Sequence, residues 1–191
     1  MKNAEDYCPE DKKDWRNWLE LNHNKKEGVW LIFYRKNSPN YNLSWSESVD
    51  EALCFGWIDS TKRTIDNRKY KQYFCKRKAK SNWSKINKEK VTILIDQGLM
   101  EEEGYKSIEI AKENGSWTIL DEVEALVIPE DLKAEFTNYK GSMEYFESRS
   151  KSVKKILLHW IVSAKRKETR RKRILEIVEN ASKNMKPKQF R

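Results

Sequence analysis

The sequence predicts an α+β protein in which a small N-terminal antiparallel sheet with helices precedes a mainly helical C-terminal half. Three observations lead to this prediction. Residues 29–36 form a short apolar run rich in β-branched and aromatic side chains, which is typical of a buried strand. Residues 57–65 and 69–77 flank the turn-forming residues 66–68 and predict a hairpin. Beyond residue 84 the apolar residues follow helical spacing, and the last two helices are expected to form an αα-hairpin.

The first predicted element is a helix over residues 9–26. Pro9 suits its first turn, because proline lacks an N–H that a helix start leaves unpaired anyway. Gly28 ends the helical pattern, and the strand of residues 29–36 follows. The expected core face of this helix contains Trp15, Trp18 and Leu19.

A second helix is predicted over residues 45–55. Ser44 and Glu47 have the spacing of a capping box, in which each side chain accepts a hydrogen bond from the backbone N–H of the other residue. Gly56 is expected to end the helix, because glycine adopts a positive φ without steric penalty. The expected core stripe contains Trp45, Val49, Ala52 and Leu53.

The C-terminal half is predicted to contain helices of different lengths. Residues 84–97 and the segment that ends at Gly115 are predicted as helices, and Pro129 is expected in the first turn of a shorter one. We place a boundary near residue 120, between an α+β domain of residues 1–120 and a helical module of residues 121–191. The two parts either form separate domains or pack as one.

The last two predicted helices have pronounced apolar faces. The first contains Val153, Ile156, Leu157, Trp160, Ile161 and Ala164, and the second contains Ile174, Ile177, Val178 and Ala181. Thr169, which lies between them, is the expected cap of the last helix, and residues 186–191 are expected to be a loose tail.

The charge is arranged in blocks. The 191 residues carry a net charge of +9. Residues 60–90 contain 12 Lys/Arg and 2 Asp/Glu, and residues 150–191 contain 14 and 3, whereas residues 91–149 contain 5 and 14. Two basic surfaces are therefore expected, which either are simply solvated or contact an anionic partner.

The composition argues against several classes of protein. No apolar run approaches the roughly 18 residues of a membrane helix. The N-terminal residues lack the apolar core of a signal peptide, so we expect no membrane insertion and a cytoplasmic protein. The three cysteines (Cys8, Cys54 and Cys75) and two histidines show no metal-binding spacing, so no metal and no cofactor are expected.

Several long motifs carry a family resemblance. They are DEALCFGWIDS at 50–60, KYKQYFCKRKAKSNWSKINKEKV at 69–91, GSW at 115–117 and FESRSKSVKKILLHWIVSAKRKETRRKRI at 146–174. Together they resemble the YdeI/OmpD-associated family over roughly residues 10–185. The resemblance implies a role in protection against bacteriocins or antimicrobial peptides and an association with a porin. It implies no reaction, no cofactor and no catalytic residues.

The first candidate site lies where the hairpin ends. If the strands pair across a three-residue turn, Trp57 faces Arg77 and Asp59 faces Cys75. Arg77 is then available to bind a phosphate or carboxylate through two hydrogen bonds, or it forms a structural ion pair with Asp59 beneath the tryptophans. The candidate ligand-binding residues are Glu51, Trp57, Asp59, Arg77, Lys78, Ser81, Trp83 and Asn87.

The second candidate site is the basic junction between the last two helices. It either binds a polyanion, such as a nucleic-acid backbone, or is a solvated rim. No aromatic residue is interleaved in the run, which argues against stacking on single-stranded bases. The candidate polyanion-binding residues are Lys165, Arg166, Arg170, Arg171 and Arg173.

Three functions are consistent with these features. The leading hypothesis is a non-enzymatic protein that binds an anionic small molecule or polyanion. The second is a small-molecule enzyme with Glu51 or Asp59 as its acid–base group. The third is an interaction scaffold whose C-terminal helices dock a partner, which predicts an exposed apolar patch near residues 153–164. A nucleophilic pair of Cys54 or Cys75 with His159 is disfavoured, because no third group is positioned to orient it. Cys54 and His159 also have apolar neighbours on both sides in the sequence.

Overall fold

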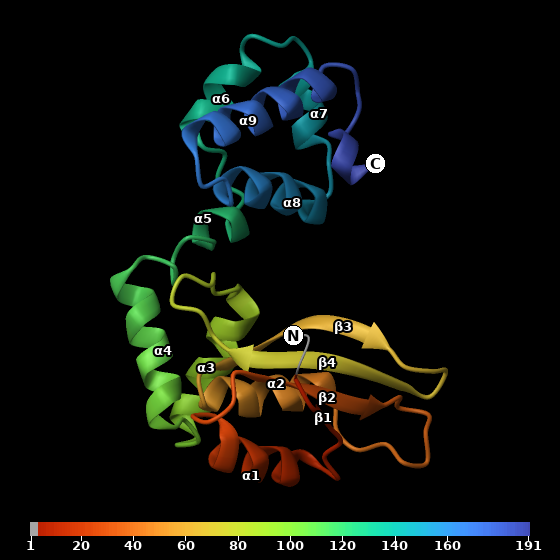
Figure 1. The fold of residues 1–191 in the computed structure, drawn as a ribbon. Coiled ribbons are helices and arrows are strands. Elements are labelled where there is room, and N and C mark those ends of the chain that lie inside the picture. The colour runs from red at the N-terminus through yellow and green to blue at the C-terminus, as the bar shows by residue number, and fades with distance from the viewer. Residues whose placement is uncertain (1–3) are drawn as a thin grey trace. The chain divides into compact units, whose positions relative to one another are not determined.

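The computed structural model describes residues 4–191 and confirms the α+β fold class. The chain divides into two compact units, residues 1–117 and residues 118–191 (Figure 1). Within the described residues, no helix has both the length and the apolar character needed to cross a bilayer. The two units are described in turn.

A four-stranded sheet forms the frame of the first unit. Its strands are β1 (Asp6–Tyr7), β2 (Gly28–Tyr34), β3 (Trp57–Thr64) and β4 (Lys69–Lys76), in the order β1-β2-β4-β3. The predicted strand and hairpin are β2 and the antiparallel pair β3–β4. The sheet differs from the prediction at its edge, where β1 pairs parallel to β2. A two-residue strand is too short to leave an alternating pattern in the sequence.

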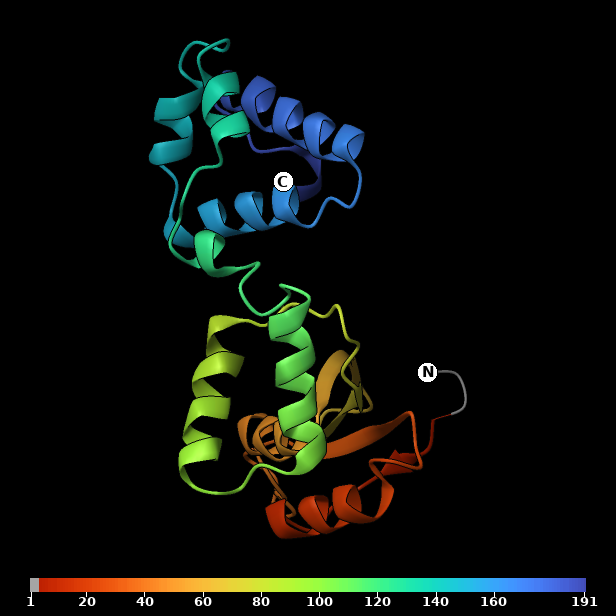
Figure 2. The same ribbon diagram turned by 90° about the vertical axis from the view of Figure 1, so that its left-hand side faces the viewer.

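Four helices complete this unit: α1 (Lys12–Asn22), α2 (Trp45–Cys54), α3 (Lys85–Asp96) and α4 (Glu102–Glu113). Helices α1 and α2 pack on one face of the sheet, and α3 and α4 contact α2 (Figure 2). Helix α1 begins at Lys12, not near Pro9 as predicted. Asp11 is the residue that caps it, because its side chain accepts from the backbone N–H of Asp14 at 2.8 Å.

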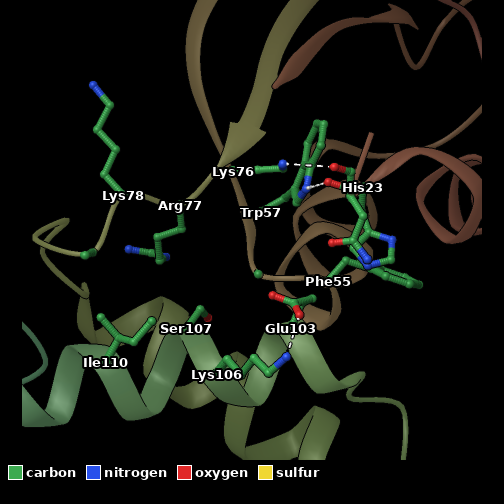
Figure 3. Close-up of a pocket in the computed structure, with 13 residues that line it drawn as sticks. His23, Phe55, Trp57, Lys76, Arg77, Lys78, Glu103, Lys106, Ser107 and Ile110 are labelled. Atoms are coloured by element: carbon green, nitrogen blue, oxygen red, sulfur yellow. Dashed lines mark hydrogen bonds and ion pairs between the residues drawn. The ribbon is translucent and has the colours of Figure 1, made fainter. Parts of the chain in front are cut away.

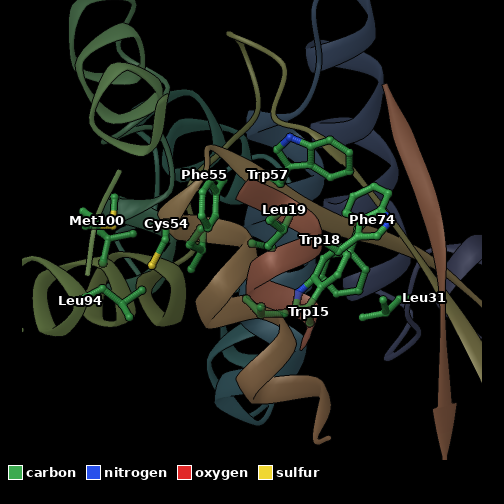
Figure 4. Packing of buried hydrophobic residues seen from close by; sticks show 14 of the residues in the cluster. Trp15, Trp18, Leu19, Leu31, Cys54, Phe55, Trp57, Phe74, Leu94 and Met100 are labelled. Atoms are coloured by element: carbon green, nitrogen blue, oxygen red, sulfur yellow. The ribbon is translucent and has the colours of Figure 1, made fainter. Parts of the chain in front are cut away.

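Large aromatic side chains fill the core of the first unit (Figure 4). The rings of Trp15 and Trp18 stack with their centroids 5.3 Å apart, and Trp18 meets Trp57 edge-on at 5.8 Å. Phe74 from β4 packs edge-on against Trp15. These contacts bury the start of β3 and the end of β4, and so hold rigidly the strand ends that carry the candidate site.

Helix α2 has the predicted ends but not the predicted core stripe. Both hydrogen bonds of the capping box between Ser44 and Glu47 are present, and Gly56 has φ +68°. Trp45, however, is 44% exposed, because it occupies the first helical position and turns toward Asp59 instead of the core. Val49, Ala52 and Leu53 are buried as predicted.

The second unit consists of helices. They are α5 (Asp121–Glu124), α6 (Glu130–Phe136), α7 (Ser142–Glu147), α8 (Lys151–Val162), α9 (Lys167–Ala181) and the 3₁₀ turn η1 (Lys188–Phe190). Helices α8 and α9 form the expected αα-hairpin. Pro129 occupies the position before α6 instead of its first turn, and its side chain makes no capping hydrogen bond. The tail predicted to be loose contains η1. Arg166, not Thr169, occupies the cap position of α9, without a capping hydrogen bond from its side chain.

Candidate functional site

A β-bulge near the base of the hairpin places the candidate residues differently from the prediction. The predicted register holds from Thr64↔Tyr70 to Lys62↔Gln72. Between Asp59 and Lys62 it shifts by one residue, so Asp59 faces Phe74 instead of Cys75, and Trp57 faces Lys76 instead of Arg77. A bulge adds one residue to one strand, and every later pair moves with it.

Asp59 is therefore held by neutral donors. Its Oδ2 accepts hydrogen bonds from Trp45 Nε1 at 2.9 Å and Gln72 Nε2 at 2.8 Å. The predicted ion pair between Asp59 and Arg77 is not among the contacts of these two residues. The carboxylate thus ties the exposed indole of Trp45 to the sheet, which is a structural role.

Arg77 is left as a largely buried cation without a carboxylate partner. Its Nη1 donates to the carbonyl oxygen of Asn82 at 3.0 Å, and its guanidinium lies 3.8 Å from the ring centroid of Trp83. Its Nε and Nη2, as well as the indole Nε1 of Trp83, are buried and have no hydrogen-bond partner in the described part of the chain. Burial lowers the pKa of Arg77 to about 10, and Asp59 and Cys75 oppose this effect only in part.

A pocket of about 230 Å³ opens beside Arg77 (Figure 3). Its apolar walls are Phe55, Trp57 and Ile110. The side chain of Arg77 extends from the end of β4 toward Ser107 and Ile110 of α4. The charged residues that line the pocket are Lys76, Arg77, Lys78, Glu103 and Lys106.

The other cations of this pocket differ in how far they are neutralised. Lys76 Nζ bonds Glu27 at 3.1 Å, and Lys106 Nζ bonds Glu103 at 2.8 Å. Lys78 is exposed and has no ion pair in residues 4–191. Arg77 and Lys78 therefore supply the positive charge that an incoming anion would meet.

The local sequence explains why the end of β4, the end of α2 and helix α4 lie close together beside the pocket. The backbone N–H of Arg77 donates to the carbonyl oxygen of Gly56 at 2.9 Å, which joins the strand end to the helix stop. A Cβ on Gly56 would lie 2.6 Å from the backbone oxygen of Glu103. Gly56 is thus required both for its positive φ and for the close approach of α4.

The remaining predicted ligand-binding residues do not line this pocket. Glu51 is 2% exposed and is held by Arg16 Nη1 at 2.8 Å and Lys12 Nζ at 3.2 Å. It lines a different cavity, together with Lys12 and Arg16. Ser81 lies in the turn after Lys78, and Asn87 lies in the first turn of α3. Glu51 and Asp59 are therefore not arranged as an acid–base pair beside Arg77.

Part of the pocket lining was not predicted from the sequence. His23 and Asn24 follow α1, and Lys106, Ser107 and Ile110 belong to α4. No local motif relates them to Arg77, because tertiary packing alone brings these segments together. A Cβ on Gly104 would clash with the carbonyl oxygen of Cys54, so this glycine marks the close approach of α4 to α2.

The basic residues of the second candidate site are partly engaged within their own unit. Arg170 forms a two-bond ion pair with Asp131, at 2.6 and 2.8 Å, and holds the pKa of that carboxyl below its usual range. Arg173 Nη1 donates to the carbonyl oxygen of Trp160 at 2.5 Å. Lys165, Arg166 and Arg171 are exposed. Of the five candidate residues, these three are therefore solvated, and the neighbouring Lys167 and Lys172 are exposed with them.

The cysteines are not activated. Cys54 is buried, and burial raises the pKa of its thiol to about 11. Burial also raises the pKa of the Cys75 thiol. A thiolate nucleophile is therefore disfavoured at neutral pH. Among the described residues, no group of three or more His, Cys, Asp and Glu is arranged to hold a metal ion.

Two family models match the chain. The model described as "Domain of unknown function (DUF8412)" matches residues 7–107, which is more than half of the chain. The model described as "Bacteriocin-protection, YdeI or OmpD-Associated" matches residues 125–184, which confirms the resemblance predicted from the sequence for this segment. The motifs at 50–60 and 69–91, on which the resemblance also rested, lie instead in the segment that the first model matches. Searches of curated proteins and of solved structures found no match.

Proposed function

This chain belongs to the family described as domain of unknown function (DUF8412) and carries a module of the bacteriocin-protection, YdeI or OmpD-associated family, and from its geometry we propose that it binds a small oxyanion at Arg77. The ligand is a phosphate ester or a carboxylate. The observation that carries the proposal is the pair of buried nitrogens, Nε and Nη2, that lack acceptors. Such donors are rare in folded proteins and mark a place where a partner belongs.

The guanidinium has the geometry for this ligand. Nε and Nη2 form one edge of the group, and two parallel hydrogen bonds from such an edge match two oxygens of a carboxylate or phosphate. Without a ligand, the guanidinium lies over the face of Trp83, 3.8 Å from the ring centroid. Because both nitrogens lie beneath the surface, binding requires the side chain to turn toward the pocket that it already lines.

The surroundings favour an anion over a neutral ligand. Lys78 adds an unpaired positive charge at the pocket, while Glu103 is neutralised by Lys106. The apolar side chains of Phe55, Trp57 and Ile110 exclude water from part of the site, which strengthens a charged hydrogen bond. We propose binding without catalysis, because Glu51 and Asp59 are both engaged in structural contacts.

Calorimetric titration of the full chain with inorganic phosphate and with acetate, at two salt concentrations, tests this proposal. Saturable binding of at least one anion is expected, and Arg77→Ala is expected to abolish it. Lys80→Ala is the matched control, since it removes one exposed positive charge three residues away. Binding that survives in Arg77→Ala, with circular dichroism showing an intact fold, would overturn the proposal.

We further propose the cellular role that the sequence and the family description suggest. Protection against bacteriocins, a cytoplasmic location and association with a porin follow from the family description and the sequence, and the anion site is compatible with them. Deletion of the gene followed by bacteriocin challenge, with complementation by the Arg77→Ala chain, connects the site to that role. Full protection by the Arg77→Ala chain would show that the protective role does not need the anion site.

A further inference from the structure

The end of the sheet remote from Arg77 gathers positive charge from two segments of the chain. The turn of the β3–β4 hairpin and the loop after β2 leave the sheet at this same end (Figure 1). The backbone N–H of Arg35 in the loop donates to the carbonyl oxygen of Arg68 in the turn at 2.8 Å, which joins the two segments. The cations at this place, here called the basic hairpin end, are Arg35, Lys36, Lys62, Arg63, Arg68, Lys69 and Lys71.

Few carboxylates neutralise the basic hairpin end. Lys71 Nζ bonds Asp6 at 2.7 Å. Lys69 Nζ lies 3.8 Å from Asp66, whose carboxylate also accepts from the backbone N–H groups of the turn. The other cations are exposed and form no ion pair within residues 4–191: Arg35, Lys36, Lys62, Arg63 and Arg68. Like charges gathered in this way repel one another, and an anionic partner relieves that repulsion.

The cations continue onto the face of the sheet that lies away from α1 and α2. Leu31 of β2 belongs to the core beneath these helices, so its neighbour Trp30 points to the other face. Trp30 is nevertheless only 3% exposed. The guanidinium carbon of Arg63 lies 4.7 Å from its ring centroid, Lys71 Nζ lies 5.2 Å away, and the ring of Tyr73 is 5.2 Å distant. Arg63 is therefore held over the sheet while the residue itself stays exposed.

Aromatic rings also accompany the cations nearer the turn. Lys69 Nζ lies 5.8 Å from the ring centroid of Tyr34, and Lys62 Nζ lies 4.0 Å from that of Tyr70. Aromatic rings and guanidinium planes are the surfaces on which unpaired bases stack. The basic run at 164–173 contains no aromatic residue, so the two basic surfaces of the chain differ in this respect.

From this arrangement we propose that the basic hairpin end binds single-stranded nucleic acid. Phosphate groups of the strand pair with the exposed cations, and unpaired bases stack on the guanidinium of Arg63 and on Tyr34. The aromatic rings favour a single strand, because a duplex keeps its bases stacked inside and an acidic protein offers carboxylates alone. The site is independent of the oxyanion site, since Lys69 and Lys76 at the two ends of β4 lie roughly 23 Å apart.

Fluorescence anisotropy of a labelled oligothymidylate of about 16 nucleotides, titrated with the full chain, tests the proposal. Saturable binding is expected. If the five unpaired cations each contact a phosphate, the logarithm of the association constant falls with the logarithm of the salt concentration with a slope of about −3.5. The dissociation constant then rises by about a hundredfold between 50 and 200 mM salt.

Three variants separate the parts of the site. Lys62→Gln combined with Arg63→Gln is expected to weaken binding at 50 mM salt by at least about tenfold and to lower the salt slope by about 1.4. Lys165→Gln combined with Arg171→Gln is the matched control, because it removes the same charge from exposed positions of the second unit, and it should change the affinity by less than about twofold. Tyr34→Leu keeps every charge and is expected to weaken binding by at least about fivefold without changing the slope.

Four outcomes overturn the proposal. Absence of saturable binding at 50 mM salt identifies the basic hairpin end as a solvated surface. Equal weakening by the two double variants indicates attraction to the net charge alone. A duplex of the same length that binds as tightly would refute the single-strand assignment. Polyglutamate that displaces the oligothymidylate at equal charge would identify an acidic protein as the partner instead. Arg77→Ala is expected to leave the oligothymidylate affinity unchanged, so the two sites succeed or fail separately.

Discussion

Replacing Arg77 with methionine is expected to stabilise the ligand-free protein while it removes anion binding. Each buried donor without an acceptor lowers the free energy of unfolding by about 1 to 3 kcal/mol, and Arg77 has two. The variant loses the hydrogen bond to Asn82, worth about 1.5 to 3 kcal/mol, and the cation–π contact with Trp83, worth about 0.5 to 2 kcal/mol. Methionine regains a sulfur–aromatic contact of about 0.3 to 1.5 kcal/mol. Central values leave a net stabilisation of about 1.4 kcal/mol.

Urea unfolding followed by tryptophan fluorescence measures this change, because seven of the eight tryptophans lie in residues 1–117. The midpoint should rise without a change in slope. Lys80→Met is the control, and an exposed substitution of this kind is expected to stay within about 0.5 kcal/mol. Destabilisation by more than about 1 kcal/mol in Arg77→Met alone would refute the reasoning, since Nε and Nη2 would then have partners in solution.

Three further predictions follow from the same contacts. Anion affinity should be full below pH 9 and fall as pH rises through about 10, because Arg77, with its lowered pKa, loses its charge there. A series of anion titrations at different pH values measures this. An affinity that stays constant up to pH 11 would contradict the prediction. Gly56→Ala should destabilise the protein by about 1 to 2 kcal/mol because of its positive φ, and by a further amount because the added Cβ clashes with α4. Gly98→Ala should cost less, because Gly98 has a similar φ of +67° but open space around it. Thermal unfolding compares the two variants, and equal losses would argue against the close approach of α4. Arg170→Ala should cost at most about 1 kcal/mol near neutral pH, because the pair is partly exposed. Since Arg170 lowers the pKa of Asp131, the ion pair contributes to stability above about pH 4, and this contribution is lost as the pH falls through the lowered pKa of Asp131. Denaturant unfolding of Arg170→Ala and the unmodified chain at pH 2 and pH 7 measures this, and an equal loss of stability at both pH values would contradict the prediction.

Local rules predicted the parts of the fold that depend on neighbouring residues. The capping box of Ser44 and Glu47 and the helix stop at Gly56 need only a few residues in sequence, and both are present. The hairpin was found because its turn and its alternating strands are local as well. These features fix where β3 begins.

The exact placement of the candidate site depended on interactions that the sequence does not display. A single bulge between Asp59 and Lys62 moved Asp59 away from Arg77, and bulges have no strong sequence pattern. The pocket wall from α4 comes from a segment about thirty residues after Arg77 in the chain. Ile156 shares the helical spacing of core residues, yet it is 49% exposed, because spacing alone does not show which side of a helix the rest of the protein covers.

The central claim is that Arg77 is an oxyanion receptor, and its Nε–H proton reports on this directly. In ¹H–¹⁵N spectra recorded with increasing phosphate or acetate, the Nε–H signal that disappears in Arg77→Lys identifies this residue. The account predicts that this signal shifts downfield and saturates, because Nε gains an acceptor, while the exposed Arg171 signal barely moves. A signal of Arg77 that stays unchanged for both anions, or that drifts together with that of Arg171 without saturation, would contradict the account.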